Sequence, residues 1–262
     1  MKPSISQLKT KMENVTRCRL CNQARPLLRK SHIIPEFMYA SLYDKHHKLY
    51  KLAPADYVKG EGRVERHSSG EYEADILCKE CDGVIISRYE TYAHEVLFGT
   101  NQERSEMMTC HSLVRPGGIK YTLRENVEYA RFRLFLLSVL WRASISRRPL
   151  FKEVSLGPYE ERVRQMVLIG DPGNPEEFPV VLFTWLHEHS VPTDIIGQPG
   201  INRKETGIRY IFPIGGIVYV YHISPDSLLK QWREFILTEE NRLFLIHTPE
   251  GHSGALLKTY FS

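Results

Sequence analysis

Two pairs of closely spaced cysteines limit most strongly what this chain can fold into. Cys18 and Cys21 form one Cys-x-x-Cys sequence, and Cys78 and Cys81 form a second one. Two intervening residues let one tight turn present both thiols to the same ion, and two such turns supply the four sulfur ligands of a structural zinc site. The sequence therefore predicts a Zn²⁺ site with Cys18, Cys21, Cys78 and Cys81 as ligands, and metal-dependent folding around it.

The alternative for these cysteines is a redox-active pair and a second pair that arose by coincidence. Residues 22–77 separate the pairs, which is longer than a compact zinc ribbon, so a folded segment is expected between them. The chain has five cysteines, and only Cys110 is left over, as an expected inert thiol. Two complete pairs favour the metal site over the redox interpretation.

The cellular location is predicted from cysteine use and from the absence of apolar segments. The chain has no apolar signal segment at its N-terminus and no apolar run long enough to cross a membrane. Cysteines that serve as metal ligands are typical of a reducing compartment. We therefore expect a cytoplasmic protein with no membrane partner.

Composition favours a folded protein, and the distribution of charge makes nucleic acid a candidate partner. The 262 residues are 42% apolar and 25% charged, which excludes disorder over the whole length. The net charge of +4 is small because basic segments at 9–30 and 115–148 are offset by an acidic segment at 151–190. Basic segments that meet in space form a phosphate-binding surface, although solvated helix faces and ion pairs are the alternative. The candidate nucleic-acid-binding residues beside the first cysteine pair are Arg17, Arg19, Arg25, Arg29 and Lys30.

Hydrophobic patterns predict an α+β chain in three parts: a zinc-binding module (1–98), a linker (99–120) and a helix-plus-antiparallel-sheet domain (121–262). A helix follows the second cysteine pair, with Asp82 as its N-cap. Thr122 and Glu125 form a capping box for a long helix that ends near Ser146. Further expected elements are helices at 158–167 and 225–236, strands at 178–187 and 242–247, and a hairpin around Gly215-Gly216.

A resemblance to a known family comes from the residues between and after the cysteine pairs. Ser31-His32-Ile33-Ile34-Pro35 follows the first pair, and Leu77-Cys78-x-x-Cys81 opens a helix. This succession resembles the HNH (His-Me finger, ββα-metal) nucleases over about residues 17–97. The resemblance implies a treble-clef zinc module in which His32 is a general base that activates water. It also implies a Mg²⁺ or Mn²⁺ ion that stabilises the scissile phosphate.

Three positions differ from the family pattern and determine the expected ligands of that second ion. Ser31 stands where the family has a metal-binding Asp, Glu73 stands at an Asn position, and Asp82 stands where a His or Asn follows the last cysteine. Carboxylate oxygens suit Mg²⁺ and Mn²⁺, so Asp82, together with Glu73 or Asp75, is the expected ligand set. Glu90 lies about 12 Å beyond Asp82 along the helix axis, so we expect it to pair with an arginine instead.

Two functions follow as hypotheses. The first is an HNH-like endonuclease that hydrolyses DNA phosphodiester bonds, of the kind found in bacterial, phage, defence or mobile-element contexts, with His32 and Asp82 as catalytic residues. Its C-terminal domain would select a target, a protein partner or a second copy of the chain. The second is a catalytically inactive zinc module that binds nucleic acid or a protein. His187 and His189 are a weaker candidate metal pair.

Overall fold

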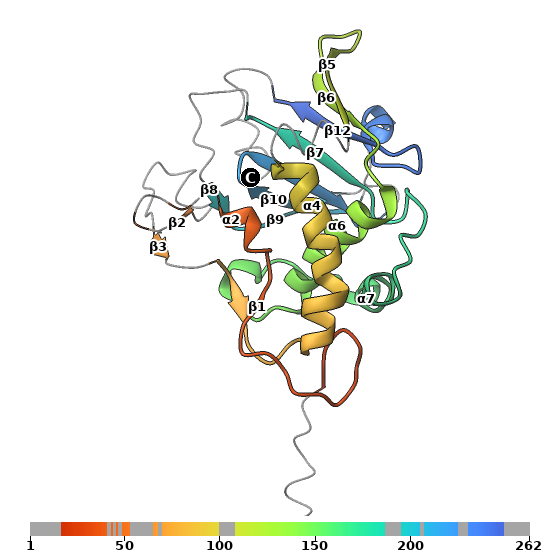
Figure 1. Cartoon of the computed structure of the whole chain (residues 1–262). Coiled ribbons are helices and arrows are strands. Elements are labelled where there is room, and N and C mark those ends of the chain that lie inside the picture. The colour runs from red at the N-terminus through yellow and green to blue at the C-terminus, as the bar shows by residue number, and fades with distance from the viewer. Residues whose placement is uncertain are drawn as a thin grey trace, which may run out of the picture.

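The computed structural model describes residues 17–40, 43, 46, 49–52, 65–67, 70–99, 108–186, 195–204, 207–224 and 230–248. Within these ranges the fold is α+β, with a large twisted sheet and several helices (Figure 1). A cluster of four cysteines lies in the N-terminal region. None of the described helices combines the length and the apolar character that a membrane span requires.

The N-terminal region contains a two-stranded sheet and two helices. Antiparallel pairing places Ser31 opposite Glu73 and His32 opposite Tyr72. After the second strand the chain forms a π-helical turn that continues into a regular helix. The elements are β1 (Ser31–His32), α2 (Phe37–Ala40), β4 (Tyr72–Glu73), η1 (Cys81–Ile86) and α4 (Ser87–Phe98).

The large sheet draws strands from both ends of the chain, in the order β3-β2-β8-β10-β11-β7-β12-β6-β5, with β9 beside β10. Two strands of the predicted zinc-binding module belong to it, because β2 pairs with β8 and β3 pairs with β2. The sheet therefore crosses the predicted boundary between module and C-terminal domain. Its strands are β2 (Leu49–Leu52), β3 (Glu65–His67), β5 (Thr109–Val114), β6 (Lys120–Glu125), β7 (Val180–Thr184), β8 (Ile195–Gly197), β9 (Gly200–Lys204), β10 (Gly207–Ile214), β11 (Ile217–His222) and β12 (Arg242–His247).

Alternation along the central strands explains why both faces of the sheet are covered. In β7, Val180 and Leu182 belong to the larger apolar core, while Val181 and Phe183 belong to a second, smaller core. The larger core includes α4, α6 (Tyr129–Ile145) and α7 (Glu160–Ile169). The smaller one is closed by η5 (Lys230–Phe235), whose Trp232 packs edge-on against Phe183. Two short 3₁₀ segments, η2 (Pro149–Phe151) and η3 (Gly157–Tyr159), connect α6 to α7.

The long helix begins later than the sequence predicts. Residues Thr122 and Glu125, expected as a capping box, instead lie in β6, which pairs with β5 on one side and β12 on the other. Asn126 then turns the chain with a φ of 66°, and α6 starts at Tyr129. The backbone N–H of Tyr129 donates to the Asn241 side-chain oxygen at 3.0 Å, so a residue distant in sequence satisfies this helix end.

The segment predicted as a linker also contains regular structure. Thr109–Val114 forms β5 at the edge of the large sheet, and the β5–β6 hairpin extends away from the helices (Figure 1). The chain turns at Gly117 and Gly118, both of which have positive φ. The hairpin at Gly215-Gly216 and the strand at 242–247 are confirmed, and the helix predicted at 158–167 is found at 160–169.

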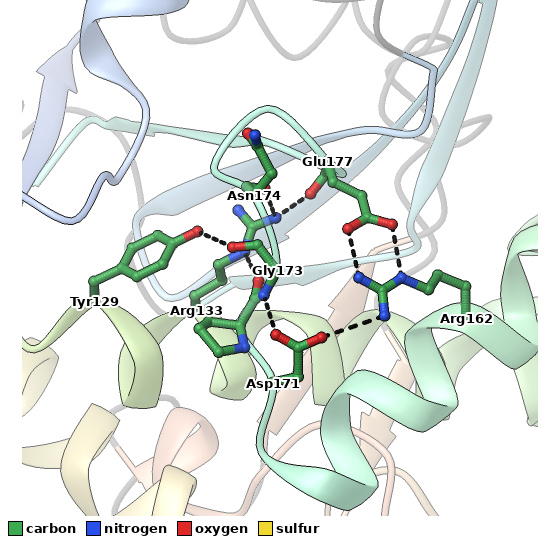
Figure 2. A network of polar contacts seen from close by, with 8 residues as sticks. Tyr129, Arg133, Arg162, Asp171, Gly173, Asn174 and Glu177 are labelled. Atoms are coloured by element: carbon green, nitrogen blue, oxygen red, sulfur yellow. Dashed lines mark hydrogen bonds and ion pairs between the residues drawn. The ribbon is translucent and has the colours of Figure 1, made fainter.

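A buried arginine organises the loop after α7. Arg133 of α6 is 3% exposed, and its guanidinium donates to the carbonyl oxygens of Asn174 and Glu177 (Figure 2). It also donates to those of Pro172 and Pro175. Arg162 braces the same loop from outside through both carboxylate oxygens of Glu177, at 2.8 Å each. One cation thus replaces the water that these carbonyl groups would otherwise bind.

We expect Arg133→Met to lower the free energy of unfolding by about 3 kcal/mol, because the apolar side chain leaves several buried carbonyl groups without donors. Arg131→Met is the matched control. Arg131 lies on the same helix but is 45% exposed, with Glu128 at 3.4 Å, so the control should lose less than about 1 kcal/mol. Urea unfolding of both variants checks this, and equal stability would contradict a structural role for Arg133.

Candidate metal centre and the histidine beside it

The four cysteines predicted as zinc ligands come together. The sulfur atoms of Cys18, Cys21, Cys78 and Cys81 all lie within 4.8 Å of one another. A tetrahedral zinc ion with bonds of about 2.3 Å places its sulfur ligands about 3.8 Å apart, so a small movement of the side chains suffices to close the site. Three of the four cysteines are buried in the larger core. The donor set fits a structural metal ion such as zinc.

Backbone hydrogen bonds hold the two cysteine turns against each other. The N–H of Asn22, whose φ is 58°, donates to the carbonyl of Cys18 at 2.8 Å and closes the first turn. The N–H of Cys78 donates to Cys18 Sγ at 3.4 Å, a contact that stabilises a thiolate. Arg19 N–H donates to the carbonyl of Ile76 at 2.8 Å and joins the two segments.

His32 lies at the end of β1 with a carboxylate beside its ring. Its Nε2 is shielded from solvent and lies 2.8 Å from Glu36 Oε2, while the side chain as a whole is 25% exposed. Burial lowers the pKa of His32, and the charge of Lys30 adds to this, whereas Glu36 and Glu90 oppose it. The imidazole is therefore mostly neutral at pH 7, the state in which it can accept a proton.

Asp82 occupies a position different from the predicted N-cap. It lies inside the π-helical turn, and its backbone N–H donates to the carbonyl of Cys78 at 3.1 Å. Burial raises the pKa of its carboxyl group, an effect that Arg142 and the side chain of Ser31 oppose and Glu90 reinforces. The expectation of an N-cap was wrong because helical geometry already starts at Lys79.

A buried arginine of α6 connects these groups. Arg142 is 1% exposed, and its Nη1 donates to the carbonyl of His32 at 2.7 Å and lies 2.7 Å from Glu90 Oε1. The sequence-based expectation that Glu90 pairs with an arginine is confirmed. Basic residues of the long helix were expected as surface charges, but Arg142 instead ties α6 to β1 and α4. Its positive charge also offsets the carboxylates around it.

Glu73 has a structural set of partners. Its Oε2 accepts hydrogen bonds from Ser146 Oγ at 2.8 Å and from the Arg147 backbone at 2.9 Å, while Oε1 lies 2.6 Å from Arg147 Nε. Burial acts to raise the pKa of Glu73, but these hydrogen bonds outweigh it and lower the pKa overall. Both oxygens are thus engaged at the C-terminal end of α6.

The remaining predicted residues are exposed. Asp75 lies in a turn with a φ of 61°, and its backbone N–H donates to the carbonyl of Leu28. The five basic residues beside the first cysteine pair are also exposed: Arg17, Arg19, Arg25, Arg29 and Lys30. His187 and His189 lie outside the described residues. Over the described part of the chain, no second group of three or more His, Cys, Asp or Glu side chains is placed to share a metal ion.

Two residues of this centre were not among the predicted site residues. Glu36 lies four residues after His32, in the turn between β1 and α2, and this closeness in sequence was the signal available. Arg142 gave no such signal, because its contacts depend on how α6 packs. Comparison with known proteins gave no match: no family model fits the chain, and neither a curated protein nor a solved structure is significantly similar to it.

Proposed function

We propose that this chain is an HNH-like nuclease that hydrolyses phosphodiester bonds of DNA, built on a treble-clef module with a structural zinc ion. The observation that supports the proposal is the placement of His32. It lies on a strand that pairs with the segment before the second cysteine turn, with the Glu36 carboxylate 2.8 Å from Nε2. A neutral, partly exposed histidine with an adjacent carboxylate is a suitable general base.

In this proposal Glu36 orients the base. Glu36 Oε2 lies 2.8 Å from Nε2 without the alignment of a hydrogen bond; a small rotation of either side chain would let it accept the Nε2 proton, which leaves Nδ1 to accept a proton from water. The basic side chain of Lys30 lies near enough to lower the pKa of His32, and its Nζ lies 4.8 Å from the centre of the Tyr72 ring. Lys30 and the half-exposed Tyr72 are therefore placed to contact the phosphate and sugar of a bound strand.

The proposed divalent cation would have Asp82 as its protein ligand. Glu73 does not fit this role because both of its oxygens are engaged by Ser146 and Arg147. Mg²⁺ is commonly held by one or two carboxylates, with waters and substrate phosphates completing the coordination. When bound, such an ion would offset the charge that develops on the phosphate.

Two features favour the second candidate, a zinc module that binds nucleic acid or a protein without cleaving it. Glu73 is committed to α6, and Ser31 is fully buried where the family has an Asp. Serine is a poor ligand for a hard cation. Binding of a protein partner or a second copy through the C-terminal part stays a prediction under either function.

The experiment that separates the two candidates is a cleavage assay with supercoiled plasmid DNA and zinc-loaded protein in Mg²⁺, Mn²⁺ or EDTA. The nuclease proposal expects nicked or linear DNA with at least one divalent ion and none with EDTA. Binding of DNA without cleavage under every condition would contradict it and favour the second candidate.

Cleavage should depend on pH through His32. Because burial lowers the pKa of this histidine below its ordinary value of 6.5, the base stays deprotonated at pH 7, and the rate should fall only when the pH drops below 6.5. Glu36→Gln removes a charge that opposes this shift, so the ascending limb of the pH–rate profile should move to lower pH. A limb centred above 6.5 in the wild type would contradict the assignment of His32 as the base.

A further inference from the structure

A cavity of about 530 Å³ lies between the first cysteine pair and the helices α6 and α7. We propose that this cavity binds a phosphate group of a nucleic-acid strand or nucleotide. The side chains that carry the argument are Arg17, Arg19, Trp141, Glu160, Glu161 and Arg164.

Two of the three arginines have guanidinium N–H groups that make no hydrogen bond within the described residues. The one hydrogen bond that the described structure gives the Arg17 side chain runs from Nη1 to the carbonyl of Asn22, at 2.9 Å. The Arg19 guanidinium has no hydrogen-bond or ion-pair partner within the described residues, although its backbone is held by Ile76. Both arginines therefore present forked donors of the kind that phosphate oxygens accept.

The third arginine, Arg164, is already paired with a carboxylate and therefore adds little charge for a ligand. Arg164 lies 2.7 Å from each oxygen of Glu161, through Nε and Nη2, and its Nη1 donates to the carbonyl of Leu20. Glu161 is thereby neutralised. Glu160 accepts a hydrogen bond from Ser144 Oγ at 2.8 Å. Glu160 keeps its negative charge, so the three arginines and two glutamates of the lining give a net charge of +1, with Arg17 and Arg19 as the cations not paired to a carboxylate in the described part of the chain.

A buried donor without a partner provides an independent observation. Trp141 is 1% exposed, and its indole Nε1 has no hydrogen-bond partner. Buried indole N–H groups are usually paired, because an unpaired one loses the hydrogen bond that it makes to water. Trp141 lines the cavity, but its Nε1 is itself shielded from solvent, so a ligand oxygen can accept this hydrogen bond only after a small movement of the surrounding side chains.

The cavity is separate from the site around His32. Trp141 and Arg142 are neighbours on α6, and consecutive helical residues point about 100° apart. Arg142 reaches the carbonyl of His32, whereas Trp141 lines the cavity, so the two sites lie on different sides of α6. The bound phosphate is therefore not the one that is cleaved. This inference rests on the proposed binding of nucleic acid and not on its cleavage.

Calorimetric titration of the full zinc-loaded chain, without added divalent ion, tests the site with three probes. These are inorganic phosphate, the dinucleotide dTpdT, and dTpdT with a 5′-phosphate. We expect Arg19→Ala to weaken binding about tenfold, the effect of losing one charge-assisted contact. Arg29→Ala is the matched control, because Arg29 is exposed in the same basic segment but does not line the cavity, and it should change affinity less than twofold.

The probes also identify the source of the phosphate. Binding of unphosphorylated dTpdT indicates a backbone phosphodiester, and binding restricted to the other two probes indicates a terminal or free phosphate. In either case the indole N–H resonance of Trp141, assigned with Trp141→Phe, should shift when the probe is added. Failure of all three probes at millimolar concentration, or equal effects of Arg19→Ala and Arg29→Ala, overturns the inference. A chain that binds the probes but cleaves no DNA keeps this site and loses the proposed nuclease function.

Discussion

We expect that removal of the metal ion that the four cysteines could hold will unfold the N-terminal region and destabilise the chain by on the order of 10 kcal/mol, the scale of structural zinc binding. A loss of this size exceeds or equals the whole stability of a typical domain. The reason is the position of the cysteines: Cys18, Cys78 and Cys81 are buried in the larger core, together with residues of α4 and α6. Without a metal ion the four thiols, three of them buried, would lose the shared bonds that join the two cysteine turns.

Elemental analysis should find about one zinc ion per chain, and thermal unfolding followed by circular dichroism should shift sharply to lower temperature in EDTA. Cys78→Ser should reproduce the effect, because serine is a poor zinc ligand. The matched control is Cys110→Ser, since Cys110 lies exposed on β5, outside the cluster. Metal-free protein that unfolds at the same temperature as the metal-bound form would refute the structural zinc site.

His32→Ala should reduce DNA cleavage by a factor of about 10²–10⁴, the usual contribution of a general base. The effect on stability should be small, because the His32 side chain is 25% exposed and the hydrogen bond from Arg142 ends on its backbone carbonyl, which alanine retains. The substitution thus separates chemistry from folding.

His111→Ala is the matched control for His32→Ala. His111 is an exposed histidine on β5 with its own carboxylate neighbour, Glu125, at 3.3 Å, and β5 lies at the far edge of the large sheet. This variant should cleave DNA at the wild-type rate. If His32→Ala retains wild-type activity while its zinc content and melting temperature are unchanged, His32 is not the base.

Local sequence patterns were sufficient to predict the elements whose conformation depends on residues close to one another in the chain. The hairpin at Gly215-Gly216 follows from two apolar runs joined by residues that accept positive φ, and the structure has φ values of 59° and 78° there. The helix at 160–169 ends at Gly170, whose φ of 80° is typical of a helix C-terminus. The beginning of α6 was wrong because Thr122 and Glu125 are held in a strand by two neighbouring strands, and Asn241 supplies the helix end.

The candidate site likewise has features that follow from local sequence and features that depend on packing. The spacing of Cys18, Cys21, Cys78 and Cys81 was enough to predict a shared metal ion, since each turn presents two thiols by its own geometry. The partners and the pKa shifts of the carboxylates could not be predicted in this way. Glu73 meets Arg147 only because α6 ends beside β4, and the pKa of Asp82 rises because several elements bury it together.

The amino-acid sequence by itself thus determined the α+β class and the four cysteines that could hold a metal ion. The tertiary structure decided which arginines are surface charges and which are buried partners. Arg133 and Arg142 look like their exposed neighbours in the sequence, but packing of α6 places one against four carbonyl groups and the other between His32 and Glu90. A guanidinium enters a core only where acceptors from several distant segments converge on it, and that convergence exists only in the folded chain.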